Sequence, residues 1–219
     1  MNLDSLIDTR KGQTALVMGN GESLNSIPRP LLDRFESFGT NHIYLCGIQP
    51  TYYVCVDSRV LTEHASAIYN VASRAKLAFL SSLFSENDQP ATKSLYSLPN
   101  VCLFSKDESA FREERFLSGS TGVYVALKMA YYLGFDTALL FGVDHDEGWK
   151  HCADDYPPGV TTSESKKEQM RWHLQYASEV FRSSRRRILN FSLPSQLDSF
   201  YDRGHLEDWG PSASVANGA

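Results

Sequence analysis

Residues 137–143, with the sequence Thr-Ala-Leu-Leu-Phe-Gly-Val, limit the fold of this chain more than any other segment. Polar and apolar residues do not alternate in this short run, as they would in a strand with one exposed face. A strand that is buried on both faces is typical of a parallel sheet that helices cover on either side. The sequence therefore predicts an α/β fold with a mostly parallel sheet.

Apolar runs and helical periodicity alternate along the rest of the chain, as this fold class requires. Strands are predicted at residues 14–18, 41–45, 52–56, 77–80, 101–104 and 188–191. Helices are predicted at 28–35, at 58–72, between Thr121 and Gly134, and over about 20 residues that include Met170 and Phe181. The polar residues 85–97 are predicted to form a loop.

The length and the composition favour one domain. The chain has 219 residues, of which 42% are hydrophobic and 21% are charged, as in an ordinary globular protein. Residues 1–210 are expected to form a single domain with a lid-like loop at about 145–165, followed by a disordered tail at 211–219. The net charge of −5 offers no general attraction to nucleic acid or to an anionic membrane, so neither is predicted as a partner. The composition does not determine the oligomeric state, and a homo-oligomer is one of the alternatives.

The cysteines and the N-terminus bear on the cellular compartment. No cysteine has Cys-x-x-Cys spacing, and Cys46, Cys55 and Cys102 lie in apolar segments, which favours reduced, buried thiols. The N-terminus lacks a basic segment followed by an apolar one, and no apolar stretch reaches the length of a membrane span. These features predict a cytoplasmic protein.

The first predicted strand is followed by the turn Gly19-Asn20-Gly21. Two glycines let a backbone approach a phosphate closely, with free amides that point at the anion. The turn is not a P-loop, because no Gly-Lys-Ser/Thr follows, and Leu24 replaces the third glycine of the dinucleotide-binding motif. The predicted strand at 41–45 also ends without the acidic residue that would bind a ribose, so a nicotinamide cofactor is not expected.

A second segment that suits an anion is Ser118-Gly119-Ser120-Thr121, at the start of a predicted helix. Hydroxyls and the unsatisfied amides of a helix N-terminus stabilise a negative charge. Taken alone, this segment is an ordinary helix cap and the glycine turn is an ordinary tight turn. Together they favour a site for the phosphate of a nucleotide.

Ligands bind beyond the carboxyl ends of the strands in an open parallel sheet, because the loops gather there. Besides the glycine turn, Asp57 follows one predicted strand, Asp144-His145-Asp146 follows another, and residues 192–195 follow the last. Asp144 has three interpretations, as a Mg²⁺ ligand, as a general base, or as part of a polar turn. Adjacent side chains on an extended segment point to opposite faces, so no metal site is assigned to the three residues together.

Histidines and a tyrosine complete the set of candidate residues. His151 lies in the predicted lid, where a loop movement would bring its imidazole to a substrate hydroxyl; an exposed histidine without a catalytic role is the alternative. Tyr124 faces the loop end of its predicted helix and is assigned to the substrate or lid region, like His145 and Asp146. His173 lies on the apolar side of the last long helix and is predicted to be a core residue.

The order of these motifs resembles the bacterial sialyltransferases of glycosyltransferase family 42 and their MptE-like relatives, long grouped as domain of unknown function 115. That wider group includes pterin diphosphokinases, flagellin glycosylation factors and many phage proteins. The similarity covers roughly residues 14–200 and includes 189–197, which looks like the segment that ends the fold in the wider group. It implies a Rossmann-like three-layer α/β/α sandwich. The motifs that carry the similarity are Gly19-Asn20-Gly21-x-Ser23-Leu24, Asn41, Ser120-Thr121-Gly122-Val123-Tyr124 and Gly142-Val143-Asp144.

In the sialyltransferases the matching motifs bind CMP, and a histidine of the lid is catalytic. The resemblance therefore implies that His151, in the lid after the Gly-x-Asp strand, is the catalytic histidine. Asp144 is assigned to catalysis as well. Asp57 stands where those enzymes carry an asparagine, and a carboxylate accepts hydrogen bonds where an amide can also donate them, so the donor is not assumed to be the same. The residues to which nucleotide binding is assigned are Gly19, Asn20, Gly21, Ser23, Asn41, Asp57, Ser120, Thr121 and Gly122.

Three functions are consistent with these motifs. The first is a glycosyltransferase that moves a sugar from a nucleotide-sugar donor of the CMP-sugar type to an unidentified acceptor, with a histidine as the base and no metal or tightly bound cofactor. The second is a pterin-type diphosphokinase, in which Asp144 or Asp57 places Mg²⁺ on the phosphates of ATP. The third is a nucleotide-binding protein without catalytic activity, such as a phage accessory factor. The first function is the one we expect.

Overall fold

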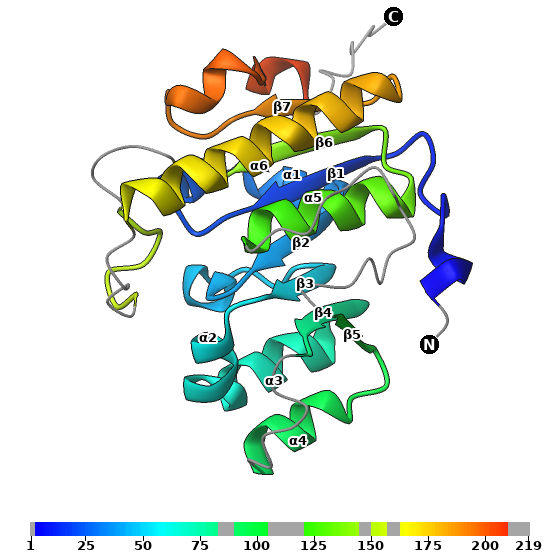
Figure 1. Cartoon of the computed structure of the whole chain (residues 1–219), viewed down its shortest axis with the longest axis vertical. Coiled ribbons are helices and arrows are strands. Elements are labelled where there is room, and N and C mark those ends of the chain that lie inside the picture. Colours follow the sequence, from blue (N-terminus) through cyan, green and yellow to red (C-terminus); the bar gives the residue numbers. More distant parts are fainter. Residues whose placement is uncertain (1–2, 83–89, 105–120, 145–149, 157–162, 210–219) are drawn as a thin grey trace, which may run out of the picture.

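The computed structural model of the chain describes residues 3–82, 90–104, 121–144, 150–156 and 163–209. Its centre is a sheet of eight parallel strands in the order β5-β4-β3-β2-β1-β6-β7-β8 (Figure 1). The strands are β1 (Thr14–Met18), β2 (Glu36–Thr40), β3 (Tyr52–Cys55), β4 (Leu77–Ser81), β5 (Val101–Phe104), β6 (Thr137–Phe141), β7 (Arg187–Asn190) and β8 (Asp202–Arg203). The predicted α/β fold with a parallel sheet is confirmed.

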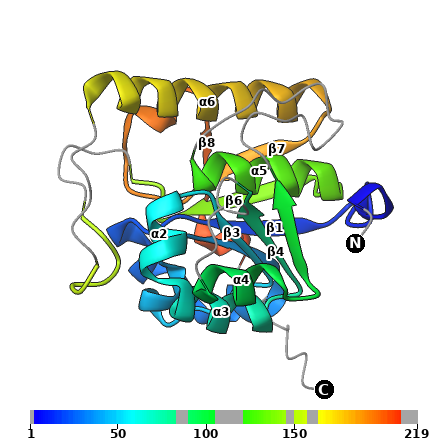
Figure 2. The same ribbon diagram turned by 60° about the horizontal axis from the view of Figure 1, so that its bottom comes forward.

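Helices cover both faces of the sheet and complete the predicted three-layer sandwich. Figure 2 shows α5 and α6 on one side of the sheet, and α2, α3 and α4 on the other. The helices are α1 (Arg29–Arg34), α2 (Ser58–Glu63), α3 (Ala65–Arg74), α4 (Pro90–Tyr96), α5 (Gly122–Leu133) and α6 (Glu164–Ser183). Short 3-10 helices are η1 (Leu3–Leu6), η2 (Glu22–Ser26), η3 (Ile43–Cys46), η4 (Gln196–Ser199) and η5 (Leu206–Asp208). None of these helices in the described part of the chain is long and apolar enough to cross a membrane.

Strand β1 shows why a continuous apolar sequence is needed at the centre of the sheet. Ala15 and Val17 pack in the core on the side of α5 and α6, whereas Leu16 and Met18 pack in the core on the opposite side. All four side chains are fully buried. Because successive side chains of a strand point to opposite faces, a central strand between two helical layers must be apolar at every position.

The order of the strands reverses direction at β1. Strands β2 to β5 are added on one side of β1, and the chain then crosses to its other side to form β6 and β7. In an open parallel sheet, a crevice opens at such a point between the carboxyl ends of the two strands whose connections diverge. The loops after β1 and β6 meet at this position.

Two predicted elements are wrong. Residues 41–45 were expected to form a strand, but the strand is β2 at Glu36–Thr40, and η3 follows it. Asn41 adopts a left-handed backbone with φ 45°, which ends the extended conformation before the apolar residues of η3. Within 85–97, expected to be a loop, Pro90–Tyr96 forms α4, with proline at the first position of the helix, where its missing amide has no cost.

The predicted state of the cysteines is wrong for one pair. Cys46, at the end of η3, forms a disulfide with Cys152, and their Cα atoms are 5.9 Å apart. Cys55 and Cys102 are free and buried, as expected. The two paired residues are 106 positions apart in sequence, so only the fold brings them together.

Candidate functional site

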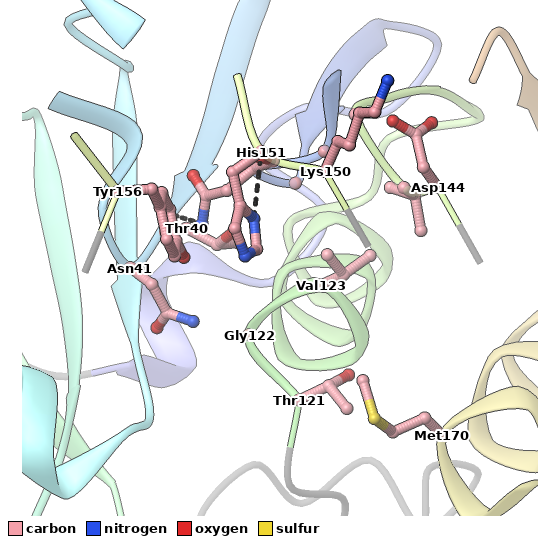
Figure 3. A pocket seen from close by; sticks show the side chains of 15 residues that line it. Thr40, Asn41, Thr121, Gly122, Val123, Asp144, Lys150, His151, Tyr156 and Met170 are labelled. Carbon is pink, nitrogen blue, oxygen red and sulfur yellow. Dashed lines mark hydrogen bonds between the residues drawn. The ribbon is translucent and has the colours of Figure 1, made fainter. Parts of the chain in front are cut away.

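A cavity lies where the loops after β1, β2 and β6 meet the start of α5 (Figure 3). This is the point at which the strand order reverses, and where an α/β sheet is expected to bind ligands. Eight of the residues assigned to nucleotide binding or catalysis line it, and Asp144 is one of them. The lining residues are Gly19, Asn20, Gly21, Thr40, Asn41, Thr121, Gly122, Val123, Gly142, Val143, Asp144, Lys150, His151, Tyr156 and Met170.

The glycine turn approaches the end of β6 so closely that larger residues do not fit. A Cβ atom on Gly19 would lie 2.3 Å from the carbonyl oxygen of Gly142. The Gly19 amide donates to the carbonyl of Phe141, and the Gly21 amide donates to that of Gly142. These two amides are therefore not free to bind a phosphate, contrary to the expectation from the motif. The glycines instead let two neighbouring strand ends pack backbone to backbone.

Asp144 fastens the same turn to two other segments. One carboxylate oxygen accepts from the Ser23 amide at 2.8 Å. The other accepts from the Ser23 hydroxyl at 2.5 Å and from the Leu193 amide at 3.1 Å. Because hydrogen bonds to a carboxylate are stronger than those between neutral groups, this aspartate fixes the positions of the loops after β1, β6 and β7 relative to one another. Three donors are thus satisfied by one side chain at the cavity wall.

Asn20 and Asn41 both line the cavity, and each has a side-chain oxygen that is unsatisfied. The Asn20 side-chain nitrogen donates to the carbonyl of Thr40 at 3.0 Å. Asn41 follows β2, and its main-chain amide donates to the carbonyl of Val54. Both side-chain oxygens are buried without a hydrogen-bond partner among the described residues. A buried polar atom without a partner costs about 1–3 kcal/mol, so a ligand with N–H or O–H donors would be stabilised here.

The N-terminus of α5 supplies the opposite wall. Thr121 caps the helix, because its hydroxyl accepts from the amide of Tyr124 at 3.1 Å. The first amides of a helix have no acceptor within it, and in α5 these belong to Gly122 and Val123, which both line the cavity. A Cβ atom on Gly122 would lie 3.1 Å from Thr40, so glycine lets the helix start close to the end of β2. This end of the helix favours a negative charge.

His151 lines the cavity (Figure 3) and pairs with Gly21 of the glycine turn in an antiparallel bridge. Its Nδ1 atom is 3.3 Å from the carbonyl oxygen of Asn20. A carbonyl only accepts, so Nδ1 carries the proton, and Nε2 keeps a free lone pair. Burial lowers the pKa of His151 below its ordinary value, against the opposing effect of the bond to Asn20. The imidazole is therefore neutral at neutral pH and able to accept a proton.

Tyr156 and His42 support His151, and neither was found from the sequence. The ring of Tyr156 stacks on His151 with centroids 3.6 Å apart, and the His42 ring packs edge-on against Tyr156 at 4.9 Å. His42 is buried, its Nδ1 atom is 2.8 Å from the Tyr44 hydroxyl, and its ring is 4.7 Å from that of His64. Burial and then the proximity of His64 lower the pKa of His42 to about 4. The sequence signal for His42 as a site residue was its position next to the apolar residues 43–45.

Other assigned residues lie elsewhere. Asp57 is exposed and caps α2, where it accepts from the amides of Arg59 and Val60, and it is not among the lining residues. The Tyr124 side chain is fully buried in the core, with its ring 4.9 Å from the buried His173. Three assigned residues, Ser120, His145 and Asp146, lie outside the described part of the chain. Within that part, no group of three or more His, Cys, Asp or Glu residues is placed to hold a metal ion.

The fold is similar to that of solved sialyltransferases. The sialyltransferase CstII from Campylobacter jejuni, in complex with the substrate analogue cytidine-5′-monophosphate, matches with a TM-score of 0.54 and 16% identity over 89% of this chain and 86% of that one. A variant of CST-II with CMP matches with a TM-score of 0.56 and 14% identity over 88% and 87%. A complex of CstII with CMP-3FNeuAc gives 0.55 and 16% over 88% and 86%. No protein-family model and no curated protein matches the sequence.

Proposed function

We propose that this protein is a glycosyltransferase that moves a sugar from a CMP-sugar donor to a hydroxyl acceptor. The observation that carries the proposal is the pair of unsatisfied oxygens of Asn20 and Asn41 at the point of strand reversal. The similarity of the fold to sialyltransferases with bound CMP supports the choice of donor. We also propose, from the motifs of the sequence, that the chain belongs to the wider MptE-like group.

The cavity offers complementary groups for a nucleotide. The oxygens of Asn20 and Asn41 accept hydrogen bonds from hydroxyl or amino groups of the donor. Its phosphate is assigned to the start of α5, where Thr121 and the amides of Gly122 and Val123 lie, because the amides of Gly19 and Gly21 already have acceptors. Ser120 joins this group on the basis of the sequence motif alone.

His151 is the proposed general base. Its Nε2 atom takes the proton of the acceptor hydroxyl while that oxygen forms a bond to the anomeric carbon of the sugar. The bond between the anomeric carbon and the phosphate oxygen breaks, and CMP leaves with its electron pair. The amides at the start of α5 stabilise the negative charge that develops on the departing phosphate. Asp144 keeps the turn beneath His151 in place.

Thermal unfolding with nucleotides tests the choice of donor. CMP at about 100 times its Kd should raise the Tm by roughly 5–10 °C, because a ligand that binds only the folded state stabilises it by about 2.7 kcal/mol. EDTA should leave this shift unchanged. The variants Asn20→Ala and Asn41→Ala should lose most of the shift, whereas Asn70→Ala, on the exposed side of α3, should keep it. A shift with ATP and Mg²⁺ but none with CMP would favour the diphosphokinase.

Release of CMP from the CMP-sugar tests the role of His151, even without the acceptor, because water can replace the acceptor hydroxyl. The variant His151→Ala should release CMP about 10²–10⁴ times more slowly and still bind CMP, because general-base catalysis contributes about this factor. The matched control is His205→Ala, which changes an exposed histidine that is not among the residues lining the cavity. Equal rates for His151→Ala and the unchanged protein would exclude the general base.

A further inference from the structure

The segment 150–156 contacts η3, the short helix after β2, and His42, the residue that precedes this helix. Cys152 is disulfide-bonded to Cys46. Four residues further on, Tyr156 packs against His42, which lies four residues before Cys46. Two short segments that are distant in sequence are thus joined, in antiparallel directions, by one disulfide and one ring contact.

The other side of the same segment is paired with the glycine turn. The Glu22 amide donates to the carbonyl of Lys150 at 3.1 Å, and the Cys152 amide donates to that of Asn20 at 2.9 Å. Between them, His151 forms the bridge with Gly21. The segment therefore lies between η3 and the turn, and it forms the part of the cavity wall that carries His151.

We infer that the Cys46–Cys152 disulfide positions this wall, so that nucleotide affinity depends on the redox state of the two cysteines. The inference rests on the proposed function for the identity of the ligand. The disulfide closes a long loop of the chain, and without it Cys152 must be held against η3 by non-covalent contacts alone. The contacts that remain include two backbone hydrogen bonds to the turn, the contact of His151 Nδ1 with the Asn20 carbonyl, the exposed Lys150–Glu22 ion pair, and the ring contacts of Tyr156 with His151 and His42.

The chemistry of the change is a thiol–disulfide exchange with a dithiol. A thiolate of the dithiol attacks Cys46 or Cys152, the bond between the two sulfurs breaks, and a mixed disulfide forms. The second thiol of the dithiol then releases the protein and becomes part of a cyclic disulfide. Two electrons and two protons pass to the cysteines. Both are half-buried, whereas Cys55 and Cys102 are buried and remain thiols throughout.

The experiment compares one protein in two redox states. Intact mass should show a gain of about 2 Da on reduction with dithiothreitol, because two hydrogen atoms are added. Isothermal titration should give a Kd for CMP about tenfold higher after reduction, as expected when the binding-competent fraction falls to about a tenth. The double variant Cys46→Ser/Cys152→Ser should bind CMP like the reduced protein and should not respond to dithiothreitol.

A second measurement needs no nucleotide. Amide hydrogen exchange followed by NMR should show that Glu22 and Cys152 lose protection on reduction, and the pKa of His151 should rise toward its ordinary value as burial is lost. Two free thiols at Cys46 and Cys152 before reduction would overturn the inference. So would unchanged exchange and an unchanged Kd after complete reduction. Absence of CMP binding in both states would contradict the proposed donor, while amide exchange would still decide the positioning role.

Discussion

Contacts within the protein leave no room for a side chain at Gly21. A Cβ atom there would lie 2.4 Å from a carboxylate oxygen of Asp144 and 2.9 Å from the carbonyl oxygen of Gly142. Neither atom can move freely, because the first is held by Ser23 and the second belongs to the end of β6. The sequence motif suggests a phosphate-binding turn, but in the structure its glycines allow two loops to pack closely.

We therefore expect Gly21→Ala to shift the turn and to weaken CMP binding at least tenfold, with a loss of stability of about 1–3 kcal/mol from the displaced contacts. Titration calorimetry and urea unfolding measure the two effects. The control is Gly12→Ala, which also replaces a glycine but lies in open space before β1. Because Gly12 has φ 78°, its variant should lose about 1 kcal/mol of stability without a change in affinity. Equal affinities for both variants would contradict the role of Gly21.

The lowered pKa of His42 predicts how the free energy of unfolding depends on pH. Its pKa is about 4 in the folded protein and ordinarily 6.5, so the unfolded chain binds a proton at a pH where the folded protein does not. The neutral His42 therefore makes its full contribution to the stability of the folded protein above pH 6.5, and this contribution is lost as the pH falls toward 4. Between pH 7.5 and pH 5 this histidine alone should lower the free energy of unfolding by about 2 kcal/mol.

Urea unfolding at the two pH values measures this effect. The variant His42→Asn is expected to be less stable at pH 7.5, because the contact with Tyr44 is lost, but its stability should fall by about 2 kcal/mol less on acidification. The variant His205→Asn, at an exposed position, should keep the pH dependence of the unchanged protein. The same pH dependence in His42→Asn would show that other groups cause it.

At the scale of elements, Asp144 connects three loops that follow three different strands. Its carboxylate accepts from two groups of Ser23 and from the amide of Leu193. An asparagine has one acceptor oxygen in place of two, so Asp144→Asn should lower the free energy of unfolding by about 2 kcal/mol. We expect CMP affinity to fall as well, because the turn that carries Asn20 loosens.

Urea unfolding with and without Mg²⁺ distinguishes this role from that of a metal ligand. The control Asp33→Asn changes an exposed carboxylate on α1 and should leave stability within about 0.5 kcal/mol of the starting value. A variant Asp144→Asn that retains full stability but loses a Mg²⁺-dependent stabilisation would support the alternative interpretation of Asp144.

At the scale of the whole molecule, the disulfide joins parts of the chain on the two sides of the strand reversal. Cys46 and Cys152 are 106 residues apart, and closing a loop of about 100 residues contributes about 4–5 kcal/mol in the chain-entropy model. The oxidised protein should be more stable than Cys46→Ala/Cys152→Ala by about this amount in urea unfolding. Dithiothreitol should remove the difference. Equal unfolding midpoints without reductant would contradict the cross-link.

The sequence was sufficient for the main elements of the fold. The apolar residues of β1, β3 and β6 predict buried strands, since such runs can be satisfied only between two helical layers. The cap of α5 was also evident, because Thr121 and Gly134 are the residues that begin and end such a helix. The strand β2 was missed, since Ser37 and Gly39 give it no continuous apolar run.

The α/β class and the polar loops at the carboxyl ends of the strands can be predicted from the sequence, because these features depend on local periodicity and turn chemistry. How those loops meet is seen only in the folded protein. There, the amides of the glycine turn donate to carbonyls at the end of β6, Cys152 is bonded to Cys46, and the ring of His42 packs against Tyr156. These contacts join residues that are distant in sequence, and their existence depends on strand order and loop packing, which no local pattern encodes.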